Sequence, residues 1–137
     1  MPSFDGLSRY SSQLLGLLRV VAGLLFLEHG LVKLIGFPPG AQPGAQPLAT
    51  LLGAAGVIET VTGALIALGL FTRPAAFLAA GEMAIAYWMF HGSKSFYPAV
   101  NGGDAAILFC FLFLYLAAAG PGELSVDSSL RSGRRTA

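Results

Sequence analysis

The run SSQLLGLLRVVAGLLFLEHGLVKLI, from Ser11 to Ile35, decides the fold class of this chain. It exceeds the roughly 20 mostly apolar residues that a helix needs to cross the hydrocarbon core of a bilayer. Within it lie the ionisable side chains of Arg19, Glu28, His29 and Lys33. Ionisable groups at membrane depth are costly, and they usually face the interior of a helix bundle. The run therefore predicts a membrane-spanning helix whose polar side chains need partners elsewhere in the chain.

The composition indicates a membrane protein rather than a soluble one. Of 137 residues, 55% are hydrophobic and 11% are charged, and the mean hydropathy is +0.70. Soluble domains carry about 25% charged residues, so this chain has too few charges to cover a soluble surface. The lipid bilayer is therefore its first expected partner. A net charge of +1 provides no broad basic surface for nucleic acid, which we exclude as a partner.

Four apolar runs predict an all-α fold, an integral membrane four-helix bundle. Transmembrane β-strands would alternate in polarity, whereas these runs are continuous and rich in Leu, Ala and Gly, which favours helices. In the third run, Thr72 is a plausible N-cap and Pro74 a favourable first helical residue. The predicted spans are approximately residues 11–35, 48–70, 74–91 and 103–119.

Arginine and lysine predict the orientation, because loops rich in these residues stay in the cytoplasm. One end of the spans carries Arg9, Arg73, Arg131, Arg134 and Arg135. The other end carries Lys94, and Lys33 lies where the first span finishes. Both termini are therefore predicted to be cytoplasmic. We expect a cytoplasmic segment at residues 1–10, the four-helix domain at 11–120 and a cytoplasmic tail at 121–137.

One face of the first span should point into the bundle. At 100° per residue, a single stripe contains Arg19, Gly23, Phe26, Gly30 and Lys33. The glycines on this stripe permit a close approach of a second helix. His29 lies at the edge of the stripe, whereas Glu28 points to the opposite side. We therefore expect His29 to be the leading functional residue of this segment.

Depth along the spans sorts the remaining ionisable residues into two groups. The deep group contains Arg19, Glu59 and Glu82, which could meet as an arginine with two carboxylates because the planar guanidinium serves several acceptors. This buried charge network either holds the helices together or forms a site for a proton or ligand. The outer group contains His29, Lys33, His91, Lys94, Asn101 and Asp104.

The outer group also has two interpretations. Its two lysines could snorkel to the membrane surface, and Asp104 could simply cap the fourth span. Alternatively, so many polar residues at one depth form a binding site. We assign no catalytic residue, and we expect no metal site, because the ExxH spacing of di-iron bundles is absent and Glu28 and His29 point in different directions.

The order and spacing of several motifs resemble those of the DoxX family of small bacterial and archaeal membrane proteins. The resemblance covers about Leu14 to Leu130, with one departure at Asp104, where the family usually has Glu. The matching motifs are the Arg19 stripe with His29, the segment from Gly56 to Gly63 around Glu59, GLFTRPAA, NGGD at Asn101–Asp104 and GPGELSVDSSL.

The resemblance implies a four-helix protein of the inner (plasma) membrane of a bacterium or archaeon, associated with oxidoreductase systems. Family members include a subunit of thiosulfate:quinone oxidoreductase, so the outer group becomes a set of quinone-binding candidates. The cofactor stays open, with quinone as the candidate; other membrane or redox subunits are the expected protein partners, and a homo-oligomer is a further option. The alternative is a non-catalytic accessory or assembly subunit of a larger membrane complex, so whether the chain is an enzyme stays open.

Overall fold

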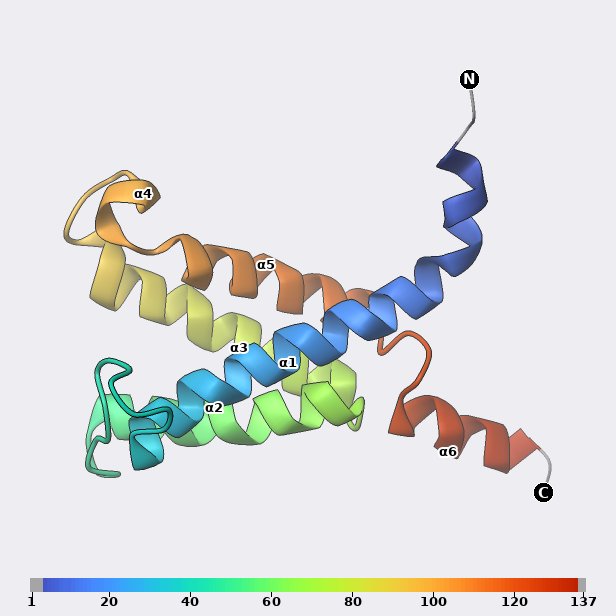
Figure 1. Ribbon diagram of the computed structural model, residues 1–137, viewed down its shortest axis with the longest axis horizontal. Helices are drawn as coiled ribbons and strands as arrows, with labels where there is room; N and C mark the ends of the chain where they lie inside the picture. The colour runs from blue at the N-terminus through green and yellow to red at the C-terminus, as the bar shows by residue number, and fades with distance from the viewer. Residues whose placement is uncertain (1–3, 136–137) are drawn as a thin grey trace.

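The computed structural model describes residues 4–135, and this part of the chain is helical without any strand (Figure 1). The all-α prediction is therefore confirmed. The long helices lie close to the four predicted ranges. The elements are the 3-10 helix η1 (Phe4–Tyr10), α1 (Ser11–Ile35), α2 (Leu51–Leu68), α3 (Thr72–Ala86), the π-helix η2 (Tyr87–Gly92), α4 (Pro98–Asn101), α5 (Asp104–Ala119) and α6 (Val126–Arg135).

Within the described residues, two helical stretches are long and apolar enough to cross a membrane, Gly6–Ile35 and Leu51–Leu68. Helix α5 is apolar as well but shorter, and α3 continues directly into η2. Leucines along the outer side of α1, including Leu14, Leu17 and Leu24, are exposed. Exposed apolar side chains on long apolar helices are typical of a lipid-facing surface.

The helices pack as two pairs. Helix α1 crosses α2, and α3 lies beside α5; α2 and α3 are joined by a short turn and also contact each other (Figure 1). Helix α4 and the 36–50 loop lie at one end of the molecule, and α6 lies at the other (Figure 1). We call these the α4 end and the α6 end.

Glycines allow the close packing of α1 against α2. A Cβ on Gly63 would lie 2.6 Å from the backbone nitrogen of Leu27, and one on Gly23 would lie 2.5 Å from the backbone nitrogen of Ala67. Neither distance leaves room for a side chain, so both positions require glycine. The stripe predicted for α1 is thus its packing face, with Arg19, Gly23, Phe26 and Gly30 all buried.

A cluster of aromatic rings connects the two helix pairs. Phe26 of α1 packs edge-to-face on Phe113 of α5, with ring centroids 4.8 Å apart. Phe109 lies 5.4 Å from Phe26 and stacks on Phe113 at the same distance. Such tilted and offset contacts are favourable for aromatic pairs. The cluster fixes α5 against α1 and so sets the width of the space between the pairs.

Arg19 ties the α6 end together through backbone carbonyls. Its side chain is fully buried, with 0% exposure. Its guanidinium donates to the carbonyls of Ile66 (2.9 Å), Ala67 (2.7 Å), Pro121 (2.8 Å) and Leu124 (2.8 Å). These carbonyls belong to the last turn of α2 and to the segment between α5 and α6. The predicted meeting of Arg19 with Glu59 and Glu82 is therefore wrong, because the guanidinium is occupied by helix-end carbonyls on its own side of the molecule.

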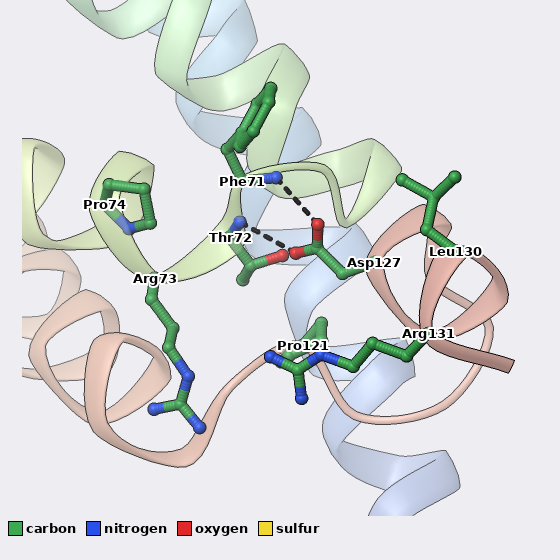
Figure 2. A pocket seen from close by; sticks show the side chains of 8 residues that line it. All are labelled: Phe71, Thr72, Arg73, Pro74, Pro121, Asp127, Leu130 and Arg131. Atoms are coloured by element: carbon green, nitrogen blue, oxygen red, sulfur yellow. Dashed lines mark hydrogen bonds between the residues drawn. The ribbon is translucent and has the colours of Figure 1, made fainter. Parts of the chain in front are cut away.

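The start of α3 is capped by a residue from α6 (Figure 2). The carboxylate of Asp127 accepts hydrogen bonds from the backbone N–H groups of Phe71 and Thr72, both at 3.0 Å. The predicted N-cap role of Thr72 is wrong, because Thr72 is already the first helical residue and Phe71 precedes it with φ 49°. Burial acts to raise the pKa of Asp127, but the hydrogen bonds from Thr72 and Phe71 outweigh it and hold that pKa below its ordinary value.

The end of α5 is capped by an arginine from α3. Arg73 donates to the carbonyls of Ala117 (2.9 Å) and Ala118. A positive charge at a helix C-terminus also interacts favourably with the helix dipole. The tail predicted at 121–137 thus contains the helix α6, which Asp127 attaches to the turn between α2 and α3. The structure does not describe the side chains of Arg134 and Arg135.

Candidate functional site

A large cavity lies between the two helix pairs and has a volume of about 970 Å³. Its walls come from α1, α2, α3, η2 and α5, and they are mostly apolar. Ligand sites of small molecules typically measure about 300–1,000 Å³ and combine apolar walls with a few polar groups. The polar side chains that line this cavity are His29, Lys33, Gln42, Glu59, Glu82, His91 and Lys94.

An ion pair between α1 and α2 forms part of the cavity wall. The ammonium of Lys33 lies 2.5 Å from the carboxylate of Glu59. The Lys33 side chain is 13% exposed and that of Glu59 is 3% exposed. The sequence placed these residues at different depths. They meet because side chains on a helix tilt toward its N-terminus, so Lys33 reaches back from the end of α1 to Glu59.

Glu82 of α3 lies in the same cavity but has no such partner. Both of its carboxyl oxygens are buried, and no residue in the described part of the chain hydrogen-bonds them. Glu59 and Lys33 both act on it electrostatically. The two carboxylates that were predicted as a buried network with Arg19 therefore belong to the cavity and have Lys33 as their cation.

His29 lies on the α1 side of the cavity. Its Nδ1 is 2.8 Å from the carbonyl of Leu25, and its ring packs edge-to-face on Phe109 with centroids 5.8 Å apart. A carbonyl only accepts, so Nδ1 carries the proton in this hydrogen bond. The neutral ring then presents Nε2 as an acceptor.

His91 lies across the cavity on the π-helix η2. Its Nδ1 is 3.0 Å from the carbonyl of Asn101, so it also donates from Nδ1 and keeps Nε2 as an acceptor in the neutral form. Its ring stacks on Tyr87 at 6.4 Å. Isolated π-turns are frequent at functional sites. Lys94 follows η2 as an exposed cation at the edge of the cavity.

The last two candidates of the outer group, Asn101 and Asp104, are not among the lining residues of the cavity. Asn101 is buried and organises the loop before α5: its amide donates to the Tyr87 hydroxyl (3.2 Å) and to the Ser95 carbonyl (2.9 Å), and its oxygen accepts from the Gly103 N–H (2.7 Å). Asp104 is the exposed first residue of α5. Its position suits a charge at a helix N-terminus.

The apolar lining was absent from the predicted site. Phe77, Met83, Met89 and Phe90 all contribute to the wall from α3 and η2. In the sequence they are ordinary residues of an apolar helix, and only their position beside Glu82 and His91, at roughly helical spacing, could have identified them. In the described part of the chain, no group of three or more His, Cys, Asp or Glu side chains is placed to hold a metal ion.

Residues 14–92 match the DoxX family model. The chain belongs to the DoxX family. This matched segment contains the ion pair of Lys33 with Glu59, the unpartnered Glu82 and both histidines. It ends before Lys94, Asn101 and Asp104.

Two relatives are similar to most of the chain. An uncharacterized protein of Haemophilus influenzae is 39% identical, and the similarity covers 90% of this chain and 96% of the relative. An uncharacterized membrane protein of Mycobacterium tuberculosis is 31% identical, and the similarity covers 88% of this chain and 82% of the relative. No solved structure shows a significant match. The DoxX chain is thus a membrane protein, in agreement with its apolar helices.

Proposed function

We propose that this DoxX protein binds a quinone-like ligand in the cavity between its helix pairs. The observation that carries the proposal is a half-open, mostly apolar cavity of about 970 Å³ that is lined by the Lys33–Glu59 ion pair and the unpartnered Glu82. A quinone has an apolar ring and tail with polar oxygens at the ring. Its size and its mixed character fit this cavity.

The polar groups have the chemistry that a quinone head needs. The Lys33 ammonium is a donor for a quinone carbonyl, whereas the Nε2 atoms of His29 and His91 are acceptors for a quinol hydroxyl. Phe26 and Phe109 supply aromatic surface for the ring. The same site is therefore suited to both oxidation states of the ligand.

We propose that the electrons come from a partner protein. The chain has a single cysteine, so it cannot provide the several cysteine ligands of an iron–sulfur cluster by itself. The protein would then be the membrane subunit of a quinone-linked redox system, with other redox subunits or further copies of the chain as partners. An accessory subunit without a ligand is the competing function.

We also propose a multi-pass topology in the inner (plasma) membrane of a bacterium or archaeon. Helices α1, α2, α3 with η2, and α5 would cross the bilayer as a four-helix bundle, with the 1–10 and 121–137 segments in the cytoplasm. The arginines at the α6 end support this orientation. Reporter fusions at each terminus should report a cytoplasmic location; a periplasmic signal at either terminus would contradict this topology.

Quinone titration tests the proposed function. The purified protein in lipid nanodiscs should bind a short-chain quinone saturably, and His29→Ala should weaken binding of the corresponding quinol by about tenfold, because the quinol hydroxyl loses the Nε2 acceptor. Asp104→Asn is the matched control, because Asp104 is polar, exposed and outside the cavity lining. The proposal fails if the wild-type protein shows no saturable binding, in which case the accessory function gains support.

A further inference from the structure

We propose that Glu82 is a neutral carboxylic acid that donates a hydrogen bond to an acceptor oxygen of the bound ligand, so that ligand binding is linked to a proton held by this residue. The part of the inference that concerns the ligand rests on the proposed function. The proton on Glu82 is a property of the ligand-free protein and does not depend on the proposed function.

The surroundings of the Glu82 carboxyl group favour its neutral form. Both oxygens are buried and receive no hydrogen bond from the described residues. An ionised carboxylate in such a place loses its hydration without compensation, which costs far more free energy than burying the protonated acid. The group therefore keeps a proton rather than a charge.

The charges that face Glu82 reinforce this conclusion. From α2 comes Glu59, whose carboxylate is already paired with Lys33 of α1 at 2.5 Å. Lys33 is thus the cation that faces both Glu59 and Glu82, and it already forms an ion pair with Glu59. A charge on Glu82 would add a second, uncompensated negative charge beside Glu59, and like charges in one site disfavour the ionised form of one of them.

The other elements around the cavity do not supply a committed counter-ion. His29 of α1 and His91 of η2 are held through Nδ1 by backbone carbonyls, and Lys94 is an exposed residue after η2. Helix α5 contributes Ala105, Ala106 and Phe109 to the wall, none of which is ionisable. Glu82 is therefore an acid whose hydrogen-bonding capacity is still available inside a ligand-sized cavity.

A neutral acid in this position selects the ligand. Its O–H donates to a carbonyl oxygen, so it favours neutral molecules with a carbonyl acceptor, such as a quinone. An anionic ligand would instead meet the Glu59 carboxylate nearby. Loss of the proton from Glu82 at high pH would replace the donor by a charged acceptor and repel the carbonyl oxygen. Affinity for the ligand should therefore fall as the pH rises through the titration of Glu82.

Infrared spectroscopy of the ligand-free protein tests the proton directly. At neutral pH the wild-type protein should show the carbonyl stretch of a protonated carboxylic acid, and Glu82→Gln should remove it. The matched control is Glu123→Gln, an exposed carboxyl group in the segment between α5 and α6 and outside the membrane-spanning helices, which should leave the band unchanged. A wild-type spectrum without this band, or a band that persists in Glu82→Gln, would overturn the assignment of the proton.

Quinone titrations at several pH values test the hydrogen bond. Glu82→Leu should weaken binding by about tenfold or more, since the donor is lost. Glu82→Gln keeps an N–H donor, so it should stay within a few-fold of the wild type and lose the fall in affinity at high pH. His29→Ala should keep that fall, which separates Glu82 from the imidazole.

The outcomes separate this inference from the proposed function. Equal affinity and equal pH dependence of wild type and Glu82→Leu would overturn the role of Glu82 while leaving quinone binding intact. Absence of quinone binding to any form would instead overturn the proposed function and with it the hydrogen bond to the ligand, and the infrared band would still decide whether Glu82 holds a proton.

Discussion

At the scale of single residues, the charged groups of α1 have different tasks. Arg19 is structural: its guanidinium holds the end of α2 and the segment before α6 through backbone carbonyls. Lys33 lies in the cavity and pairs with Glu59. Both residues lie on one stripe, and the helical period predicted that stripe correctly. Their partners could not be predicted, because those depend on how the chain returns after α5 and on the tilt of side chains along a helix.

Replacing Arg19 by lysine should destabilise the protein although the charge is kept. A single ammonium cannot reproduce the planar fork that serves carbonyls on two segments, so buried carbonyls lose their donors. We expect a loss on the order of 3 kcal/mol in the free energy of unfolding, measured as a lower thermal midpoint in detergent. The control Arg9→Lys, at an exposed position, should change little. An unchanged midpoint for Arg19→Lys would contradict the structural role.

At the scale of elements, helix α6 is the part that the sequence did not reveal. Most of its side chains are polar, so its sequence alone resembles a solvated tail. Asp127 attaches the helix in two ways. Its carboxylate caps α3 at Thr72, which is 55 residues earlier in the chain, and its backbone N–H donates to the carbonyl of Gly69 at 2.9 Å. A cap supplied from so far along the chain leaves no local sequence pattern, whereas the glycines of α1 and α2 recur at helical spacing.

Asp127→Asn should weaken the attachment of α6 in a pH-dependent way. The ionised carboxylate accepts from the N–H groups of Phe71 and Thr72 with its two oxygens, whereas asparagine has one acceptor oxygen, so the variant should lose one hydrogen bond, or about 0.5–1.5 kcal/mol. Because the pKa of Asp127 is lowered in the folded protein, its contribution is complete above the ordinary aspartate pKa of about 4 and disappears as the pH falls through the lowered pKa. Unfolding of wild type and variant should thus differ at neutral pH and converge in acid. A difference that stays constant down to low pH would argue against an ionised cap.

The contact between α1 and α2 depends on glycine. In Gly63→Leu, the new side chain would meet the backbone of Leu27, so α1 must move away from α2. We expect a loss of several kcal/mol in stability and a weaker Lys33–Glu59 pair, because overpacking a close contact costs about 1–3 kcal/mol and the pair adds to it. Gly81→Ala is the matched control, since no atom lies within 4 Å of its added Cβ. Equal thermal stability of both variants would contradict the close packing.

At the scale of the whole molecule, the two helix pairs enclose the cavity and the caps at the α6 end hold them in place. The all-helical fold and the membrane environment could be predicted from hydropathy and composition, because a chain with so few charges has no other solvent. The cavity could not be predicted, because its width depends on the packing of Phe26 against Phe113 and on the direction of side chains from separate helices. The outer group was predicted as one site, but Asn101 and Asp104 lie outside the cavity lining. Glu59 and Glu82, which were predicted as part of the deep group, line the cavity instead.

Photo-crosslinking with a light-activated quinone analogue, followed by peptide mass spectrometry, shows directly whether quinone binds in the cavity. We expect the label to attach to buried cavity-lining residues such as Phe26 and Met83, and an excess of unlabelled quinone to prevent this attachment. The contradicting result is a label confined to the lipid-facing leucines of α1, or a label on the cavity residues that unlabelled quinone does not displace.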